Sequence, residues 1–228
     1  MLKSISVKVI AYLNIGFAEE WRSYWNSSWT KHSHPEWLVW VEYPEWPGEY
    51  FVKYWHISAW RQGGWIDIML NELEKIIDMG FNGVILDNVD SCMMWEEPEE
   101  YGLGGLIPRV TNASEWIINL VHRLSSYAKS REKNFIVIVN IGGALELLEN
   151  ETFIDSIDVV LREEVWYSNN EQVNSSETNY TLYWLKYAKK HGREVIVLDY
   201  AWTRKYIEDT LSKARQEGFL HLFHQAMS

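Results

Sequence analysis

The chain has little of several features that define common protein classes. Its one cysteine, Cys92, excludes an intrachain disulfide and a zinc site with several cysteine ligands. Basic residues number 21 against 32 acidic ones, and the net charge of -11 argues against nucleic acid as a partner. No apolar run approaches the roughly 20 residues of a membrane span. The first residues run straight into a predicted strand, so we expect no signal peptide among them. The histidines show no metal-ligand spacing, so we expect neither a metal nor another cofactor.

Acceptor motifs for N-glycosylation are more frequent than chance would place in the chain. The chain has five such motifs, at Asn26, Asn112, Asn150, Asn174 and Asn179. An extracellular or cell-surface protein is therefore slightly favoured over a cytoplasmic one. The alternative is that polar loops are rich in Asn, Ser and Thr for other reasons.

Tryptophan is abundant, and nine of the 14 tryptophans fall between Trp21 and Trp65. This stretch is also rich in proline, glycine and charge, so we expect that one core cannot hold all nine. Aromatic faces stack on sugar rings and attract cations. Some of these side chains are expected to line a saccharide site, with a core position as the alternative for each.

Apolar runs of strand length alternate with amphipathic segments of helical period. The expected strands cover residues 7–16, 51–57, 83–90, 135–142, 157–166, 194–201 and 219–225, and the clearest helices cover 65–80, 114–132, 179–192 and 204–218. This alternation predicts a parallel α/β fold. No repeat or linker divides the chain, so residues 1–228 are expected to form a single domain.

Polar residues stand at the carboxyl ends of five predicted strands, namely Asn14, Asp87, Asn140, Glu163 and Asp199. A (β/α)8 barrel builds its active site from many strand ends, whereas a doubly wound sheet uses mainly one switch point. The pattern favours the barrel. Strand alternation predicts that Asp87, Asn140 and Asp199 point toward the barrel axis, if the fully apolar strand faces lie beneath the helices.

Two carboxylates that flank a bond are the minimal machinery for hydrolysis of a glycoside. Asp87 and one glutamate of the segment LREEVWY, residues 161–167, are candidates for this pair. A structural role, such as capping the next helix, carries about equal weight for Asp87 alone. For Asp90, which begins a loop, the structural role is favoured.

The segments that carry these residues resemble one known family. They are residues 9–25, 46–55, 80–90, 137–142, 157–167 and 195–201, and they cover nearly the whole chain. As a set they resemble glycoside hydrolase family 114, the endo-α-1,4-polygalactosaminidase-like proteins. The resemblance implies a (β/α)8 TIM-type barrel with a catalytic aspartate after the fourth strand and a catalytic glutamate after the sixth.

Carried over by the resemblance, Asp87 is the nucleophile of a retaining mechanism and Glu163 is the general acid and then the base. Residues that match the substrate pocket are Tyr12, Asn14, Glu19, Arg22, Asp90, Asn140, Tyr167, Asp199 and Tyr200. The implied partner is a polysaccharide, an α-1,4-linked galactosamine polymer. Free amino groups would make this polymer cationic, which fits the acidic balance of the chain.

The sequence departs from the family at several points. Phe17 and Asn82 stand where the family often has acids. Strict alternation would aim Glu164 inward, whereas the motif selects Glu163, and a bulge at the strand tip would reconcile the two. We keep Glu164 as the second candidate.

The largest departure is that the chain begins at the family's second strand, so the first βα unit is expected to be missing. The first and last strands would then expose unpaired edges. A truncated product, closure by residues 1–6, and self-association through a partner chain are open explanations. A non-catalytic carbohydrate-binding barrel is the alternative function, and an enzyme acting on another substrate is a third, because fold does not decide function.

Overall fold

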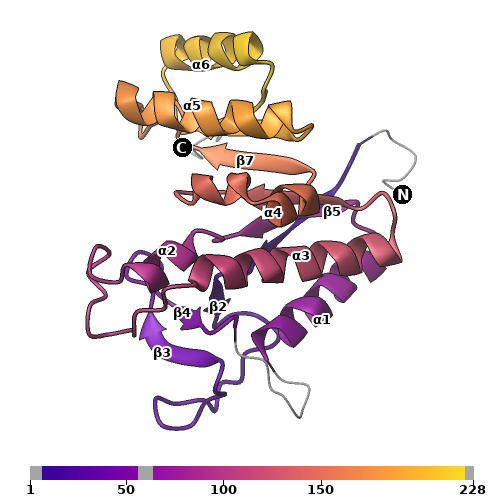
Figure 1. Ribbon diagram of the computed structural model, residues 1–228, viewed down its shortest axis with the longest axis vertical. Coiled ribbons are helices and arrows are strands. Elements are labelled where there is room, and N and C mark those ends of the chain that lie inside the picture. The colour runs from indigo at the N-terminus through magenta and orange to yellow at the C-terminus, as the bar shows by residue number, and fades with distance from the viewer. Residues whose placement is uncertain (1–6, 56–63, 224–228) are drawn as a thin grey trace.

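The computed structural model describes residues 7–55 and 64–223, and its centre is a parallel sheet (Figure 1). The strands follow the order β1-β5-β6-β7-β10-β11. Their bounds are Ile10–Asn14 (β1), Gly83–Asp87 (β5), Ile136–Asn140 (β6), Val159–Glu163 (β7), Glu194–Asp199 (β10) and Leu220–Phe223 (β11). This arrangement confirms the predicted α/β fold of the TIM-barrel type. Within the described ranges no strand pairs with the outer edge of β1 or β11, so this sheet is open.

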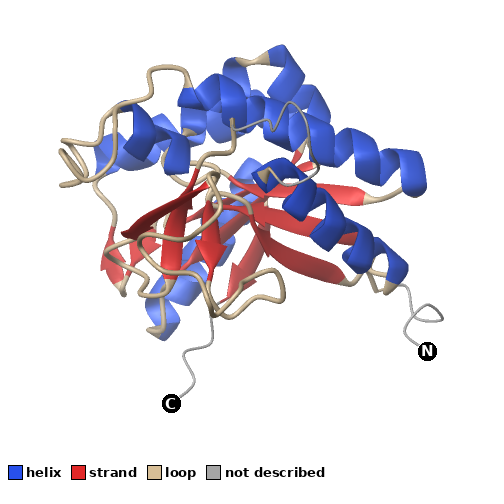
Figure 2. Ribbon diagram, turned by 90° about the horizontal axis from the view of Figure 1, so that it is seen from below, coloured by secondary structure: helices blue, strands red, loops and turns tan. Residues whose placement is uncertain are grey.

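The longer helices lie outside the strands (Figure 2). The helices are Trp65–Asp78 (α1), Ser91–Glu96 (α2), Ala113–Arg131 (α3), Glu151–Ser156 (α4), Ser175–Lys190 (α5) and Arg204–Glu217 (α6), with a 3-10 turn at Leu145–Glu149 (η2). Val84 and Leu86 of β5 are almost fully buried, whereas Ile85 on the opposite face is partly exposed. The helices therefore cover one face of the sheet, and the other face is the inner one.

One predicted strand does not join the parallel sheet. Of the expected strand at residues 51–57, only Phe51 and Val52 are in a strand, β4 (Glu49–Val52), and residues 56 and 57 lie outside the described part. β4 pairs antiparallel with β2 (Phe17–Glu19) and β3 (Leu38–Glu42). The prediction of a barrel strand here is wrong, because a tight turn folds this run back on β3. As a result β1 pairs directly with β5.

Most of the described tryptophans between Trp21 and Trp65 contribute to the core after all. Trp37 and Trp65 are buried, with ring centroids 5.1 Å apart, and Trp29 contacts Trp37 edge-on. Further tryptophans that pack against this core are Trp25, Trp40 and Trp55. Edge-to-face and tilted aromatic contacts let this core take in several tryptophans, and as expected it does not take in all of them. Only Trp21 and Trp46 of this group are strongly exposed.

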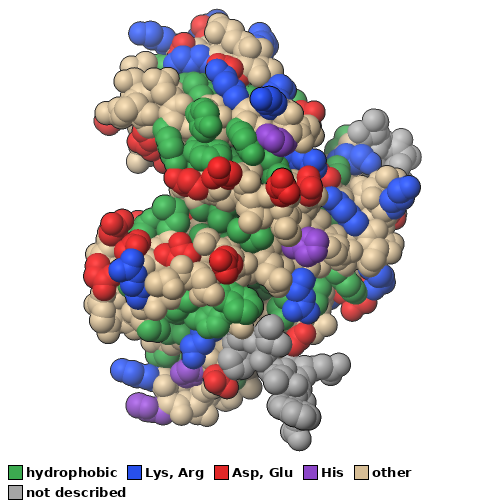
Figure 3. Space-filling view, viewed as in Figure 1, with side chains coloured by type: hydrophobic (Ala, Val, Ile, Leu, Met, Phe, Trp, Pro, Cys, Tyr) green, Lys and Arg blue, Asp and Glu red, His purple; other side chains and the backbone are tan. Residues whose placement is uncertain are grey.

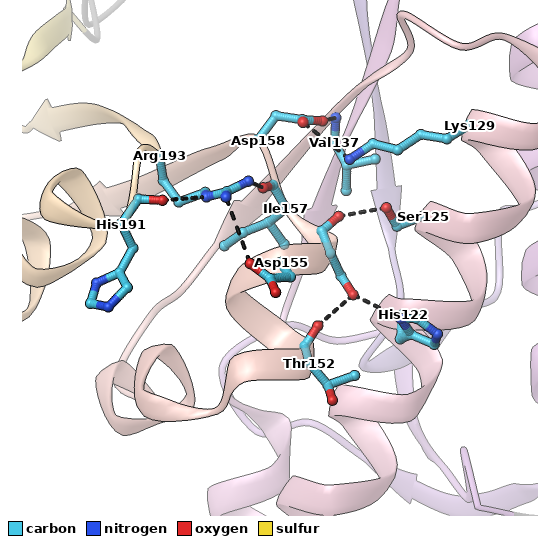
Figure 4. Close-up of polar contacts among 11 residues, drawn as sticks. His122, Ser125, Lys129, Val137, Thr152, Asp155, Ile157, Asp158, His191 and Arg193 are labelled. Carbon is cyan, nitrogen blue, oxygen red and sulfur yellow. Dashed lines mark hydrogen bonds and ion pairs between the residues drawn. The ribbon is translucent and has the colours of Figure 1, made fainter.

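A network of polar contacts lies at the amino end of β7 (Figure 4). Asp158 accepts hydrogen bonds from Lys129 Nζ at 3.0 Å and from the N–H of Val137 at 2.8 Å. Arg193 donates to the carbonyl oxygen of Ile157 at 2.8 Å. These contacts tie α3, β6, β7 and the start of β10 together at the end of the sheet where barrels usually place stabilising residues. No helix in the described ranges is both long and apolar enough to cross a membrane.

Candidate active site

A cavity of about 470 Å³ opens at the carboxyl ends of the strands. The surface is hollowed on the side toward which the β7 arrow of Figure 1 points, as Figure 3 shows. Its lining residues are Tyr12, Glu45, Trp46, Glu49, Asp87, Asn88, Asp90, Asn140, Gly142, Gly143, Arg162, Glu163, Glu164 and Tyr200. Six of the predicted site residues are therefore brought together, namely Tyr12, Asp87, Asp90, Asn140, Glu163 and Tyr200.

The register of the parallel sheet explains this convergence. Tyr12 pairs with Ile85, Ile85 with Ile138, and Ile138 with Val159. Paired residues of neighbouring parallel strands point to the same side, and so do residues two apart along one strand. Asp87, Asn140 and Glu163 each lie an even number of residues beyond these partners, so all three side chains lie on the inner face at the strand ends.

Asp87 is held by three donors. Tyr12 donates its hydroxyl to Oδ2 at 2.7 Å, Asn140 Nδ2 donates to Oδ1 at 2.8 Å, and the N–H of Asn88 donates to Oδ1 at 2.9 Å. Partial burial and the neighbouring Asp87 raise the pKa of Tyr12 above its ordinary value, so the phenol keeps the proton that it donates. An ionised carboxylate can accept all three hydrogen bonds, which hold it in one orientation.

Glu163 faces Asp87 across the Asn140 side chain. Asn140 Nδ2 lies 3.3 Å from Glu163 Oε1, and Tyr200 donates its hydroxyl to Oε2 at 2.7 Å. Burial and the adjacent Glu163 raise the pKa of Tyr200, so this phenol is also a donor at neutral pH. Because one nitrogen contacts both carboxylates, the two oxygens Asp87 Oδ1 and Glu163 Oε1 are at most about 6.1 Å apart, the sum of the two distances.

Glu163 reaches the inner face of the sheet without a β-bulge. Glu163 pairs with Leu198 of β10 and lies on the inner face by regular alternation, because Leu161 and Val159 are also on that face. The expectation that strict alternation would turn Glu163 away from the cavity is wrong, since it took the wrong face of β7 as the inner one. Glu164 follows with a φ of 55° and also reaches the cavity, where it accepts a hydrogen bond from Ser168 Oγ at 2.5 Å.

Asp90 forms part of the cavity wall together with the turn after β6. Its Oδ2 accepts a hydrogen bond from the N–H of Gly143 at 3.0 Å, and burial raises the pKa of its carboxyl group. Gly142 has a φ of 49°, and a Cβ at this position would lie 2.0 Å from Asp90 Oδ2. A glycine is therefore required after Asn140 and Ile141 so that the turn can pass over Asp90.

Three predicted pocket residues lie behind the cavity wall and support it. Asn14 is buried and donates to Glu49 Oε2 at 3.2 Å. Arg22 binds both oxygens of the buried Glu19, at 2.5 and 3.1 Å, and its guanidinium carbon lies 5.8 Å from the centre of the Tyr12 ring. These residues contact the groups that line the cavity, and they are not themselves in its lining.

The predicted orientation of Asp199 is wrong. Val195, Val197 and Asp199 alternate on the face that pairs with Val160, which is the helix-covered face, and Asp199 is only 1% exposed. Its Oδ1 accepts hydrogen bonds from the N–H groups of Trp166 and Tyr167 at 2.8 and 3.0 Å. Asp199 thus holds the chain that follows Glu163. The apolar residues before Asp199 gave no sign of which face was inner.

Tyr167 also lies outside the cavity. Its ring is buried against Tyr206 with centroids 4.5 Å apart, and its hydroxyl donates to Asp209 Oδ2 at 2.6 Å. The contact between Tyr167 and α6 attaches the loop after β7 to the helix layer. Tyr167 was expected in the substrate pocket, and the structure instead gives it a structural role.

Glu49 is a site residue that the sequence did not indicate. It comes from β4 of the antiparallel sheet, lines the cavity, and is 6% exposed. Burial, followed by the nearby charge of Glu19, raises the pKa of Glu49 from 4.5 to about 7, and Asp87 adds to this effect whereas Asn14 and Arg22 oppose it. The only signal available was its place in the segment WPGEYF, which carried the family resemblance.

Replacing Glu49 by Gln is expected to stabilise the fold at pH 8 but not at pH 5. The folded pKa of Glu49 is raised, so its neutral form is present at pH 5 and stability is lost as the pH rises through about 7. One pKa unit is equivalent to about 1.4 kcal/mol. Allowing for solvent at the open cavity, we expect a gain of about 2 kcal/mol at pH 8, measured by urea unfolding.

The matched control for this measurement is Glu45→Gln, which removes an exposed carboxylate from the same turn. It should change the free energy of unfolding little, and by the same amount at both pH values. A Glu49→Gln effect that is equal at pH 5 and pH 8 would contradict the raised pKa.

The cavity is strongly acidic. Among the described lining residues, six are carboxylates and Arg162 is the one cation. The carboxylates are Glu45, Glu49, Asp87, Asp90, Glu163 and Glu164. Such a concentration of negative charge in a cleft attracts cationic ligands and repels anionic ones.

Comparison with known proteins connects this site to one family. The model for glycoside-hydrolase family GH114 matches residues 1–227. An uncharacterised protein of Thermotoga maritima is 31% identical over 191 residues, which cover 84% of this chain and 54% of that protein. The uncharacterised protein MJ1477 of Methanocaldococcus jannaschii is 32% identical over 228 residues, which cover 96% of this chain and 61% of that protein. The chain thus spans between about half and three fifths of these relatives.

A solved structure shares the fold. The glycoside hydrolase domain of PelA from Pseudomonas aeruginosa superposes with a TM-score of 0.68, covering 99% of this chain and 81% of that chain. Sequence identity is 14%, so this likeness concerns the fold alone.

Proposed function

The chain belongs to glycoside hydrolase family GH114, and from this membership we propose that it hydrolyses a polysaccharide with Asp87 and Glu163 as its catalytic pair. The proposed substrate is an α-1,4-linked polymer that contains galactosamine, cut within the chain. The single observation that supports the catalytic pair most directly is the Asn140 amide, which contacts both carboxylates in one cavity.

The proposed reaction retains the configuration at the anomeric carbon. Retaining enzymes place their carboxyl groups about 5–5.5 Å apart, and inverting enzymes about 6.5–9.5 Å apart. The limit of about 6.1 Å between Asp87 Oδ1 and Glu163 Oε1 lies below the inverting range. Two carboxylate oxygens this close support the retaining mechanism over the inverting one.

In the first step, Asp87 attacks the anomeric carbon as Glu163 gives its proton to the leaving glycosidic oxygen. The bond between sugar and leaving group breaks, and a covalent glycosyl–Asp87 ester forms. Tyr12 and the N–H of Asn88 hold the attacking carboxylate in its orientation. The departing chain leaves with the proton from Glu163.

In the second step, Glu163 takes a proton from a water molecule, whose oxygen attacks the same anomeric carbon. The ester bond breaks, Asp87 leaves as a carboxylate, and Glu163 is protonated again for the next cycle. Tyr200 remains hydrogen-bonded to Glu163 and can steady it as its charge changes. The product carries a new reducing end.

The acidic cavity supports a cationic substrate. Among the described lining residues, six acidic side chains stand against one guanidinium. Even with Glu163 protonated as the general acid and Glu49 partly protonated near pH 7, the cavity is negative and would repel an acidic polysaccharide. A galactosamine polymer whose amino groups are free is cationic at neutral pH and suits this charge.

The test is the release of reducing ends from deacetylated α-1,4-linked galactosamine polymer. An endo-acting enzyme is expected to shorten the polymer early and to yield a range of oligosaccharides in the product profile. Binding of the polymer without release of reducing ends would instead support a non-catalytic carbohydrate-binding barrel. Absence of both binding and release would refute the proposed substrate.

A further inference from the structure

The turn between β3 and β4 is closed by backbone hydrogen bonds and reaches the cavity. The N–H of Tyr43 donates to the carbonyl of Glu49 at 2.7 Å, the N–H of Trp46 to the carbonyl of Tyr43 at 3.1 Å, and the N–H of Glu49 to the carbonyl of Trp46 at 3.1 Å. Gly48 takes a φ of 89°, which permits the reversal. Three backbone hydrogen bonds within seven residues leave this turn few alternative conformations.

This turn presents an exposed tryptophan to the cavity. Trp46 is 62% exposed and lines the cavity that contains Asp87 and Glu163. Among the described tryptophans it is the only one in the cavity lining, whereas most others of the segment pack in the core. An exposed aromatic ring in the lining of a cavity is available to stack on a ligand there.

Two carboxylates of the same turn and strand line the cavity together with Trp46. Glu45 is exposed and accepts a hydrogen bond from the Tyr43 hydroxyl at 3.1 Å. Glu49 uses Oε2 to accept from Asn14, and in the described part of the chain its Oε1 accepts no hydrogen bond. Arg22, which lies behind this wall, is paired with Glu19. Glu49 is thus a buried carboxyl group in the cavity lining with one hydrogen bond from Asn14, and such a group favours a cationic donor.

We propose that Glu45, Trp46 and Glu49 form a subsite for one sugar ring that carries an unacetylated amino group. The ring stacks through its C–H face on Trp46, and the ammonium group lies between the indole face and the carboxylates, where cation–π attraction and charge-assisted hydrogen bonds act together. The subsite adjoins the catalytic pair in the same cavity, so it holds a ring of the chain being cut. This part of the inference rests on the proposed function.

The first experiment measures binding with the catalytic step removed. In the Asp87→Asn background, we expect deacetylated galactosamine oligosaccharides to bind at least about ten-fold more tightly than their N-acetylated forms, by calorimetry. Adding Trp46→Ala should weaken binding of the deacetylated oligosaccharides by about ten-fold, since stacking and cation–π contacts of this kind amount to about 1–2 kcal/mol. Trp46→Phe should restore most of the affinity because it keeps an aromatic face.

The matched control is Tyr183→Ala on α5, which removes an aromatic side chain that is 60% exposed and lies outside the cavity lining. It should leave the affinity unchanged. Adding Glu49→Gln should reduce the preference for deacetylated over acetylated oligosaccharides. Equal binding of the two oligosaccharides by the Asp87→Asn protein, or unchanged binding after Trp46→Ala is added to it, would overturn the subsite.

Measuring hydrolysis by the protein with Asp87 intact, with and without Trp46→Ala, separates this inference from the proposed function. If the chain releases no reducing ends but binding still depends on Trp46, the proposed hydrolase function fails and the subsite stands. If the chain hydrolyses the polymer and Trp46→Ala leaves both KM and binding unchanged, the function stands and the subsite fails. With the subsite present, Trp46→Ala should raise KM about ten-fold and alter kcat by less than about three-fold.

Discussion

Asp87→Asn is expected to lower kcat/KM on the galactosamine polymer by at least about 10⁴-fold, because an amide cannot form the covalent glycosyl intermediate. The substitution is nearly isosteric. The amide oxygen at residue 87 can still accept a hydrogen bond from Tyr12 or from the N–H of Asn88. The fold should therefore be retained, and the loss of activity should not reflect unfolding.

Initial rates of reducing-end release, together with thermal unfolding of the same samples, provide the measurement. The matched control is Asp78→Asn, which alters an aspartate at the end of α1 whose side chain is 63% exposed and paired with Arg131. That variant should keep full activity. If Asp87→Asn retained more than a few per cent of the normal rate with a normal melting temperature, Asp87 would not be the nucleophile.

Glu163→Gln is expected to lower the rate by about 10²–10⁴-fold, and the size of the loss should depend on the leaving group. A polymer needs a proton on its departing oxygen, so the first step should slow strongly. An aryl galactosaminide with an acidic phenol leaves without that proton. On such a substrate, formation of the glycosyl–Asp87 ester should be nearly normal and its hydrolysis should be slow.

A burst of phenol release followed by a slow steady rate would identify this behaviour. Added azide, which needs no general base, should accelerate the slow phase and form a glycosyl azide of retained configuration. Glu164→Gln is the paired variant, because Glu164 lines the same cavity and stands next in sequence. Should Glu164→Gln show the burst and Glu163→Gln behave normally, the two assignments would be exchanged.

The sequence made the strand ends of the site predictable. Asp87, Asn140 and Glu163 each follow an apolar run at the point where a strand ends, and polar residues at that place are typical of barrel active sites. Alternation within one strand was also reliable, since Asp87 lies on the same face as Ile85 and Asn140 on the same face as Ile138. The sequence could not determine which face of each strand is the inner one.

That limitation accounts for the wrong orientations that alternation predicted for Asp199 and Glu163. Both faces of β7 and β10 carry aliphatic residues, and hydrophobic composition does not distinguish the side covered by helices from the side that faces the axis. Only the pairing of Glu163 with Leu198 and of Val160 with Val195 identifies the faces. Register describes how two strands pair, so it cannot be predicted from the residues of one strand alone.

The sequence by itself determined the α/β class, the order of most strands and the polar residues at their carboxyl ends, because these follow from local periodicity and composition. Tertiary structure alone decided that β4 turns back to bring Glu49 and Trp46 to the cavity, and that one Asn140 amide contacts two carboxylates. The physical reason is distance along the chain. Asp87 and Glu163 are far apart in sequence, and contacts between such residues depend on how whole elements pack.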